Sequence, residues 1–389
     1  MLAQTGAQAA AEAMRQIDPD VVPVYPITPQ TPIVESFSKI VADGLVNSEM
    51  IHVESEHSAM SAAVGAQAAG ARAVTASSSA GLALMFEVLG VASGMRLPIL
   101  MNIANRALSS PINIHCDHSD SMGVRDSGWI QIYSENAQEV YDHNFLALKL
   151  AEKVSLPAMV MQDGFITSHS LENLEILTDE QVKQFIGRYK PQYPLLNIEK
   201  PVTMGAIQLP DYFFETKRQQ IQAMSQAREQ YDAVAQELSK LTGRSYPKIE
   251  THNLENAQAI IVVLNSTAGT ALAAMRKLKN EFREKVGLIK IRLFLPFPQE
   301  EFREIIKKAV GENLKTIAVL DRAVSLGSDA PIAKEIKNAL FDLSNKPQVY
   351  SYIFGLGGRE IFEKDIKKVY LDLISKKTDH QVKYIGLRQ

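Results

Sequence analysis

Residues 25–32, Tyr-Pro-Ile-Thr-Pro-Gln-Thr-Pro, join a short apolar segment, residues 21–25, to residues 33–45, where apolar side chains recur with helical spacing. The three prolines fix their own φ angles and bias the preceding residues toward extended backbone. We therefore expect a stiff strand-to-helix turn, in which Thr28 or Thr31 caps the helix and the following proline takes the first helical position. Free N–H groups at such a helix start suit a carboxylate or a phosphate, and a purely structural turn is the alternative.

The same alternation of apolar strand and helix continues along the first half of the chain. It predicts βαβ units, and hence an α/β fold with a parallel sheet covered on both faces. Ligands of such sheets bind beyond the carboxyl ends of the strands, so the residues that follow each strand are the candidates for a site. The expected helices cover residues 4–17, 33–45, 58–69, 82–91 and 137–154, and the expected strands cover residues 21–25, 51–53, 71–76, 98–104 and 157–162.

The pattern changes near residue 180 and again near residue 250. Four prolines interrupt residues 190–212, which predicts an extended arm, and a polar helix follows over residues 215–241, ended by Gly243. We expect one α/β domain over residues 1–180, the arm and connecting helix over 181–250, and a second α/β domain over 251–389. The strands expected in the second domain cover residues 259–264, 286–293, 315–320 and 348–354.

Composition excludes several classes of protein. The 41 basic and 44 acidic residues give a net charge of −3, which argues against recognition of nucleic acid or of an anionic membrane through bulk charge. A single cysteine, Cys116, cannot build a disulfide framework, a zinc cluster or an iron–sulfur cluster within this chain. No signal-peptide pattern and no run of about 18 apolar residues is found, so we expect a cytoplasmic protein with no membrane span.

Two carboxylates lie where the strand over residues 51–53 runs into a helix. Glu54 and Glu56 are two residues apart, so one side chain can enter a pocket while the other points away. Small residues follow them and allow close approach of a ligand or a helix. The alternative is helix capping, because acidic groups are stable in the first turn of a helix, and we interpret His57 as structural.

Two further strand ends carry polar groups. Ser77, Ser78, Ser79 and Gly81 follow the third strand, where small side chains let a ligand approach the backbone; a plain turn would look the same. Arg106 follows the fourth strand and could hold a carboxylate through two donors, with a surface arginine as the alternative.

Residues 117–120, Asp-His-Ser-Asp, contain metal-binding residue types, but their spacing is too tight for a chelate on a regular helix or strand. We expect a loop of hydrogen-bonded side chains there and assign no metal ligand. The phosphate loop, the dinucleotide fingerprint and the Gly-x-Ser-x-Gly elbow are all missing from the sequence. So is the Gly-Asp-Gly segment that holds a magnesium diphosphate in thiamine enzymes, to which Asp163-Gly164 is the nearest fragment.

With these residues in hand, the chain resembles the α subunits of 2-oxoacid:ferredoxin oxidoreductases, most closely those of the multi-subunit pyruvate enzymes (pyruvate synthases). The resemblance covers essentially the whole chain. It implies that the first domain is the pyrimidine-binding half of a thiamine diphosphate site and that the second is similar to the transketolase C-terminal domain. It is carried by residues 25–32, 55–57, 75–82, 106, 117–120 and 163–169, and more weakly by 292–298, 321–322 and 355–359, the last being a segment whose role stays open.

The resemblance also implies roles for the candidate residues. Glu56 would face N1′ of the thiamine aminopyrimidine, where a carboxylate favours the imino form that takes the C2 proton of the thiazolium. Thr28 and Arg106 match the family positions that hold the substrate carboxylate. The residues expected to line the cofactor cleft are Tyr25, Pro26, Ile27, Glu56, Ser77, Ser78, Ser79 and Gly81.

The missing motifs fit a shared enzyme. In this family a β subunit carries the diphosphate and Mg²⁺ site, 4Fe–4S clusters lie in β and in a ferredoxin-like δ subunit, and coenzyme A contacts are expected near γ. The implied reaction is the reversible oxidative decarboxylation of pyruvate with coenzyme A to acetyl-CoA and CO₂, with electrons passing to ferredoxin. The alternatives are the same chemistry on 2-oxoglutarate, branched-chain or aromatic 2-oxoacids, or a scaffold subunit without catalysis.

Overall fold

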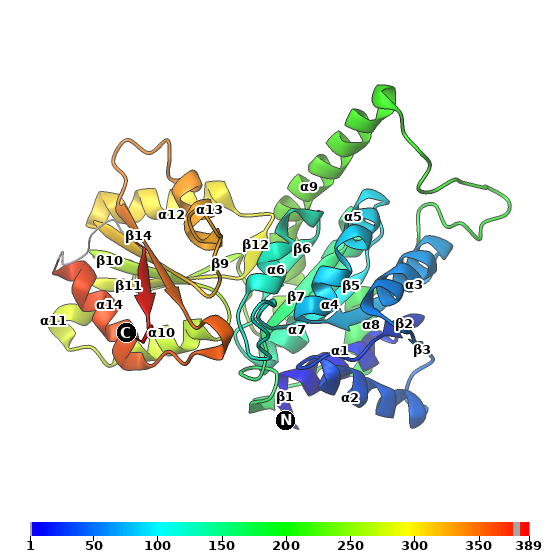
Figure 1. The fold of residues 1–389 in the computed structure, drawn as a ribbon, viewed down its shortest axis with the longest axis horizontal. Helices are drawn as coiled ribbons and strands as arrows, with labels where there is room; N and C mark the ends of the chain where they lie inside the picture. The colour runs from blue at the N-terminus through cyan, green and yellow to red at the C-terminus, as the bar shows by residue number, and fades with distance from the viewer. Residues whose placement is uncertain (1, 376–381, 389) are drawn as a thin grey trace.

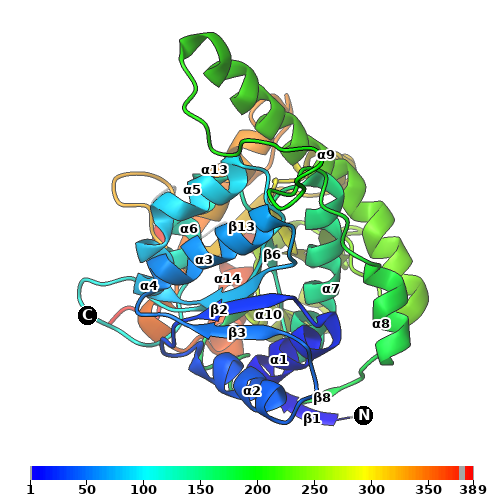
Figure 2. The ribbon, with the colours of Figure 1, turned by 90° about the vertical axis from the view of Figure 1, so that its right-hand side faces the viewer.

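The computed structural model describes residues 2–375 and 382–388, which form two α/β units side by side (Figures 1 and 2). The sheet of the N-terminal unit has the order β12-β6-β7-β5-β4, and all of its pairs are parallel except β12·β6. The two-stranded parallel sheet β2-β3 adjoins it, because Val21 bridges to Ala73 beside β4. These strands are β2 (Val21–Val24), β3 (Glu49–His52), β4 (Val74–Ser77), β5 (Leu100–Asn105), β6 (Ile130–Tyr133), β7 (Ala158–Asp163) and β12 (Leu293–Leu295).

Helices cover both faces of this sheet. The apolar face of each helix packs onto the strands, and the longest of those on the sheet, α7, buries 14 of its 18 residues because the sheet, α1 and α9 surround it. One face carries α1 (Gly6–Ile17), α2 (Thr31–Ala42) and α7 (Ala137–Val154), with α8 (Asp179–Ile186) beside them; the other carries α3 (Glu56–Ala69), α4 (Ser79–Leu84), α5 (Phe86–Gly94) and α6 (Ser119–Gly123).

An arm without regular structure, residues 187–209, leaves α8 and leads to the 33-residue helix α9 (Pro210–Thr242). The C-terminal half of α9 packs against α7, and its N-terminal half projects from the body (Figure 1). Gly243 ends the helix with a φ of +70°, as the sequence predicted.

The C-terminal unit is a second sheet between two helix layers. Its order is β15-β14-β13-β10-β11-β9, parallel except for β9·β11. Helices α12 and α13 pack on the face that shares a hydrophobic core with the N-terminal unit, and α10 and α14 pack on the other. The elements are β9 (Ile249–His252), β10 (Ala259–Val263), α10 (Thr267–Arg276), α11 (Asn280–Arg283), β11 (Val286–Ile291), α12 (Gln299–Glu312), β13 (Thr316–Asp321), α13 (Pro331–Ala339), β14 (Gln348–Phe354), α14 (Glu363–Ile374) and β15 (Lys383–Ile385).

The predicted fold class, α/β with parallel sheets, is confirmed, and the domain boundaries at residues 180 and 250 stay a prediction. The single strand expected over 286–293 is wrong: β11 ends at Ile291, and Leu293 pairs with Ile132 of the other unit. The chain switches sheets at Arg292, whose buried side chain pairs with Glu139.

Some short elements were not anticipated. The helix expected over 82–91 is two helices, α4 and α5, of which α4 begins three residues earlier, at Ser79. The four-residue strands β1 (Leu2–Thr5), β6 and β8 (Leu171–Leu174) were missed, whereas the equally short β2, β3 and β4 were expected. In the part of the chain that the structure describes, no helix is both long and apolar enough to cross a membrane.

Candidate active site

The carboxyl ends of β2, β3, β4 and β5 lie along one edge of the N-terminal sheet, and each is followed by a predicted site residue. Thr28 follows β2, Glu56 follows β3, Ser77 ends β4, and Arg106 follows β5. The parallel pairings put these strand ends beside one another, as the sequence pattern predicted.

Glu56 is the first residue of α3 and is buried, with 6% of its surface exposed. Ser55 caps the helix by accepting a hydrogen bond from the amide of Ser58. The Glu56 carboxylate makes no hydrogen bond or ion pair with any residue that the structure describes. Glu54, by contrast, is exposed and its pKa is lowered by a hydrogen bond from Ser58. The prediction that one of the two carboxylates points inward is confirmed.

A glycine and a serine face the Glu56 carboxylate. A methyl group added at Gly81 would lie 2.5 Å from Glu56 Oε1 and 2.7 Å from Ser77 Oγ, so only glycine fits there. Ser77 Oγ is fully buried and has no hydrogen-bond partner within the described residues. Because buried polar atoms are almost always paired, an unpaired hydroxyl next to an unpaired carboxylate marks a place for a polar ligand.

The neighbouring serines have structural roles. Ser78 Oγ donates to the carbonyl of Ala104 at 2.6 Å, and Ser79 Oγ donates to the carbonyl of Ala107 at 2.5 Å. Ser78 therefore ties the turn after β4 to β5 itself, and Ser79 ties it to the chain just after β5. Of the three predicted serines, Ser77 alone keeps its hydroxyl free.

Asp120 stabilises the turn after β4 through hydrogen bonds. Its carboxylate accepts from the amides of Ser79 and Arg106, at 3.0 and 2.9 Å, and from the side chain of Asn105 at 2.8 Å. Burial raises the pKa of Asp120 to about 6 although these donors favour the ionised form. Asp117 accepts from Ser119, so the expected hydrogen-bonded side chains are found, but the expected loop ends at His118, because Ser119 and Asp120 begin the short helix α6.

Arg106 and Thr28 are brought together as predicted. Arg106 Nη1 donates to the carbonyl of Thr28 at 2.9 Å, and Nε donates to the carbonyl of Asn113 at 3.0 Å. The guanidinium is largely buried, with 7% of the residue exposed, and Nη2 makes no hydrogen bond to a described residue. Thr28 is exposed, as are Tyr25 and Pro26. The arginine thus keeps donors free at the rim of the site, which suits a carboxylate.

The predicted cap of α2 is wrong. The N-cap is Gln30, not Thr28 or Thr31, and Thr31 is the first helical residue. The amides of Gln30 and Thr31 both donate to the carbonyl of Ile27, at 2.7 and 3.1 Å. These N–H groups are already paired, so they do not form the anion site that the helix start suggested.

Gln30 and Gly164 support the site and were not identified from the sequence. Gln30 is fully buried; its side chain donates to the carbonyl of Ala76 and accepts from the amide of Ile27. A methyl group at Gly164 would lie 2.6 Å from Cγ of Pro29, so this glycine allows the turn that contains Pro29 to pack against the end of β7. The one signal in the sequence that could have identified Gln30 is its place between Pro29 and Thr31, where the helix was expected to begin.

Cys116, His118 and Asp163 place their ligand atoms within 4.8 Å of one another, a spacing also found in metal sites. However, Arg322 Nη1 lies 3.3 Å from Asp163 Oδ2 and 3.6 Å from Cys116 Sγ. A fixed positive charge already fills this cluster, so we interpret it as a contact that joins the two units.

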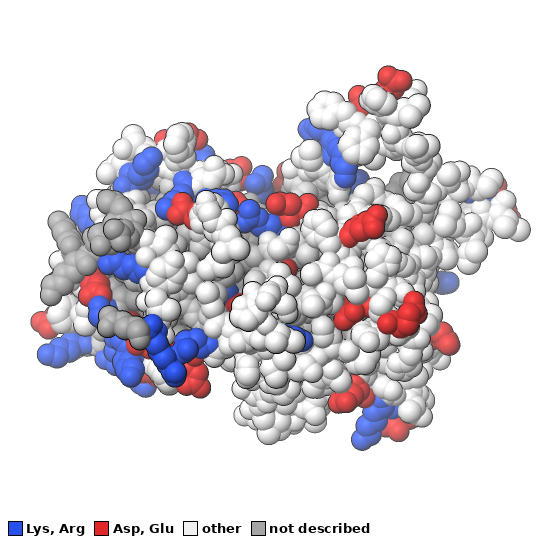
Figure 3. Space-filling view, viewed as in Figure 1, with Lys and Arg blue, Asp and Glu red and all other residues white. Residues whose placement is uncertain are grey.

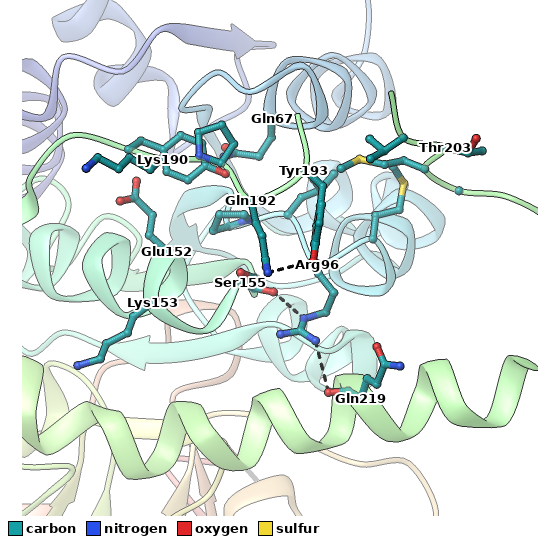
Figure 4. A pocket seen from close by; sticks show the side chains of 18 residues that line it. Gln67, Arg96, Glu152, Lys153, Ser155, Lys190, Gln192, Tyr193, Thr203 and Gln219 are labelled. Atoms are coloured by element: carbon teal, nitrogen blue, oxygen red, sulfur yellow. Dashed lines mark hydrogen bonds between the residues drawn. The ribbon is translucent and has the colours of Figure 1, made fainter. Parts of the chain in front are cut away.

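A cavity of about 770 Å³ lies under the arm, between the ends of α3, α5 and α7 and the side of α9. Arg96 spans it by donating to the carbonyls of Ser155 and Gln219 (Figure 4). None of the predicted site residues lines this cavity, so the candidate site is the open edge of the sheet rather than this enclosed space.

Comparison with known proteins identifies the family. Residues 12–236 match the family "Pyruvate flavodoxin/ferredoxin oxidoreductase, thiamine diP-bdg", and residues 257–366 match "Pyruvate:ferredoxin oxidoreductase core domain II". The chain therefore belongs to the pyruvate flavodoxin/ferredoxin oxidoreductase family and is an α subunit of a 2-oxoacid:ferredoxin oxidoreductase.

Its relatives narrow this class. The chain is 52% identical to pyruvate synthase subunit PorA of Thermotoga maritima over 100% of this chain and 98% of that protein. It is 45% identical to PorA of Methanocaldococcus jannaschii over 99% and 97% of the two chains. It is also 40% identical to the ketoisovalerate oxidoreductase subunit VorA of Pyrococcus horikoshii over 99% and 98%.

A solved structure shares the fold. A 2-oxoglutarate:ferredoxin oxidoreductase from Magnetococcus marinus, solved with 2-oxoglutarate, coenzyme A and succinyl-CoA bound, superposes with a TM-score of 0.71 at 20% identity. The match covers 96% of this chain and 65% of that chain. At this identity the likeness supports the fold alone.

Proposed function

We propose that this chain is the α subunit of a pyruvate:ferredoxin oxidoreductase. The reaction converts pyruvate and coenzyme A to acetyl-CoA and CO₂, and two electrons pass to ferredoxin; it is reversible. One observation carries the proposal: a buried, unpaired carboxylate, Glu56, faces Gly81 at the carboxyl edge of a parallel sheet. The full-length relatives named pyruvate synthase subunits support it.

The residues at this edge fit the pyrimidine end of thiamine diphosphate. Glu56 offers a carboxylate and Ser77 a hydroxyl that no described residue of the chain binds. Gly81 has no side chain, so the space beside these two groups stays open. When bound, this cofactor supplies the carbanion nucleophile and the electron sink that decarboxylation of a 2-oxoacid needs. Tyr25, Pro26 and Ile27 would form the rim.

Glu56 would exchange a proton at Oε1 with the bound pyrimidine. Its position at the start of α3 fixes the backbone, and burial keeps water from competing for that proton. Arg106, held by the carbonyls of Thr28 and Asn113, would bind the substrate carboxylate through Nη2.

Partner subunits would complete the enzyme. This chain has one cysteine and no Gly-Asp-Gly segment, so we assign the diphosphate and Mg²⁺ site to a β subunit and the 4Fe–4S clusters to β and δ subunits, with γ as a further partner near coenzyme A and ferredoxin as acceptor. Leu84 and Phe86, just after the Gly81 turn, are 51% and 57% exposed. The face of the N-terminal unit seen in Figure 3 is largely uncharged, as expected of a surface that another protein covers.

The test is Glu56→Gln in the assembled complex, with Glu54→Gln as the matched control. Glutamine keeps the shape of Glu56 but cannot take the proton, so we expect pyruvate oxidation to fall by about 10²–10⁴-fold. Glu54→Gln, two residues away and exposed, should stay within about twofold of wild type. Co-purification of the partners shows that assembly survives. Full activity of Glu56→Gln would refute the proposed role of Glu56, and a wild-type complex that does not oxidise pyruvate would refute the proposed reaction.

A branched-chain 2-oxoacid is the second candidate substrate. Its support is the 40% identity to a ketoisovalerate oxidoreductase subunit, which lies close to the values for several pyruvate synthase subunits. Steady-state rates of the wild-type complex with pyruvate and with ketoisovalerate decide between them. A higher kcat/KM for pyruvate supports the first candidate, and a higher value for ketoisovalerate supports the second.

A further inference from the structure

The glycine turn of the C-terminal unit, residues 355–359, lies against a loop of the N-terminal unit. This loop, residues 107–118, contains no helix or strand. The amide of Gly358 donates to the carbonyl of Cys116 at 2.7 Å, and the amide of Gly357 donates to Asp117 Oδ2 at 3.1 Å. In the other direction, Asn113 Nδ2 donates to the carbonyl of Gly357 at 3.1 Å. The turn therefore holds the second half of the loop, at Asn113 and at Cys116 and Asp117.

The fit between turn and loop requires glycine. A methyl group at Gly357 would lie 2.5 Å from Asn113 Nδ2, and one at Gly358 would lie 2.4 Å from His115 Cβ. Both glycines also have positive φ angles, +57° and +79°, which side chains disfavour. Any larger residue must push the loop away from the C-terminal unit.

The same loop holds Arg106. Arg106 Nε donates to the carbonyl of Asn113, and the next amide, that of Ala107, donates to the carbonyl of His115 at 3.0 Å. Asn113 is thus bonded to Arg106 through its backbone and to Gly357 through its side chain. A displacement of the loop at Gly358 would move the carbonyl on which the guanidinium rests.

We propose that Gly357 and Gly358 are positioning residues for Arg106, so that docking of the C-terminal unit sets the angle of the guanidinium that binds the 2-oxoacid carboxylate. The inference rests on the proposed role of Arg106 and gives the glycine turn a function. It predicts that substrate affinity depends on a segment that lies about 250 residues from the arginine in the sequence.

The test compares Gly358→Ala with Gly327→Ala in the assembled complex. Gly327 also has a positive φ, +84°, but has nothing within 4 Å of an added methyl group, so it controls for backbone strain. We expect Gly358→Ala to raise the KM for pyruvate roughly tenfold with kcat changed less than threefold, because a shifted guanidinium weakens binding of the carboxylate. Gly327→Ala should leave KM unchanged.

The double variant separates positioning from general damage. Arg106→Ala alone should raise KM, and Arg106→Ala with Gly358→Ala should raise it no further, since the glycine acts through the arginine. An additive increase, or an unchanged KM in Gly358→Ala while Arg106→Ala raises it, would overturn the inference and leave the role of Arg106 intact. An unchanged KM in Arg106→Ala itself would overturn both.

A milder variant covers the case in which Gly358→Ala does not assemble. Asn113→Ala removes the side-chain bond to the carbonyl of Gly357, together with the bond that Asn113 Oδ1 accepts from the amide of His115, and keeps the carbonyl that accepts from Arg106. We expect a rise in KM of about twofold to fivefold, again absent in the Arg106→Ala background. An unchanged KM in Asn113→Ala would contradict the proposal.

Discussion

Glu56 and Asp163 are both buried carboxylates near strand ends of the N-terminal unit, and their surroundings are opposite. Asp163 accepts from His118 at 2.7 Å and from Asn265 at 2.9 Å, pairs with Arg322, and accepts from Ser266. Glu56 has no such partner among the described residues. The contrast separates a carboxylate that joins the two units from an unpaired one, which we propose is kept for a ligand.

Asp163→Asn should produce the largest change in stability. Asparagine leaves the buried guanidinium of Arg322 without its counter-charge, and breaking such a pair costs about 3–5 kcal/mol. We expect a clear drop in the thermal unfolding midpoint of the purified complex. Glu56→Gln, which removes no internal partner, should leave that midpoint within about 2 °C. Equal losses in the two variants would remove the distinction between the carboxylates.

The pH dependence of the stability lost in Asp163→Asn is a second test of the comparison between Asp163 and Glu56. Burial alone would raise the pKa of Asp163, but Arg322 and His118 outweigh it and hold that pKa well below its usual range. A carboxylate with a depressed folded-state pKa adds stability above its unfolded pKa of about 3.9, and this stability is lost as the pH falls below that value. The difference in midpoint between wild type and Asp163→Asn should therefore be constant from pH 8 to 5 and shrink below about pH 4.

Gly81→Ala tests whether the space beside Glu56 is reserved. The added methyl group would overlap the carboxylate and Ser77 Oγ, so we expect activity to fall about 10–100-fold. Stability should change little, because alanine favours the helix α4 by up to about 1 kcal/mol and offsets the overlap. Gly65→Ala in α3, which meets nothing within 4 Å, is the control and should keep full activity. Wild-type activity in Gly81→Ala would mean that the space is not used.

The sequence predicted those features of the two carboxylates that depend on neighbouring residues in the chain. Strand ends, the helix after Glu56 and the alternation of Glu54 with Glu56 follow from periods of two and 3.6 residues. The partners of Asp163 could not be predicted, because His118, Asn265 and Arg322 come from three segments distant in sequence, and the last two belong to the other unit. Long-range pairing leaves no trace in a local pattern.

The prediction of the N-cap of α2 was wrong for a related reason. Thr28 and Thr31 both have the chemistry of an N-cap, but Gln30 is drawn into the core by the carbonyl of Ala76, 46 residues away. That bond fixes the turn and overrides the local preference. The turn that this bond joins to the core also contains Thr28, whose carbonyl accepts from Arg106.

The smallest expected effect separates two adjacent serines. Ser77 Oγ has no partner, whereas Ser78 Oγ donates to the carbonyl of Ala104. Ser78→Ala should lower stability by about 1 kcal/mol, because it removes a buried hydrogen bond to the carbonyl of Ala104, and should keep kcat per assembled complex. Ser77→Ala removes no internal bond, so its stability should be unchanged, while a lost contact to the ligand should lower kcat/KM about twofold to tenfold. Thermal midpoints and steady-state rates of the two variants check this; the reverse pattern, with Ser78 controlling the rate and Ser77 the stability, would mean that an unpaired buried hydroxyl does not mark the site.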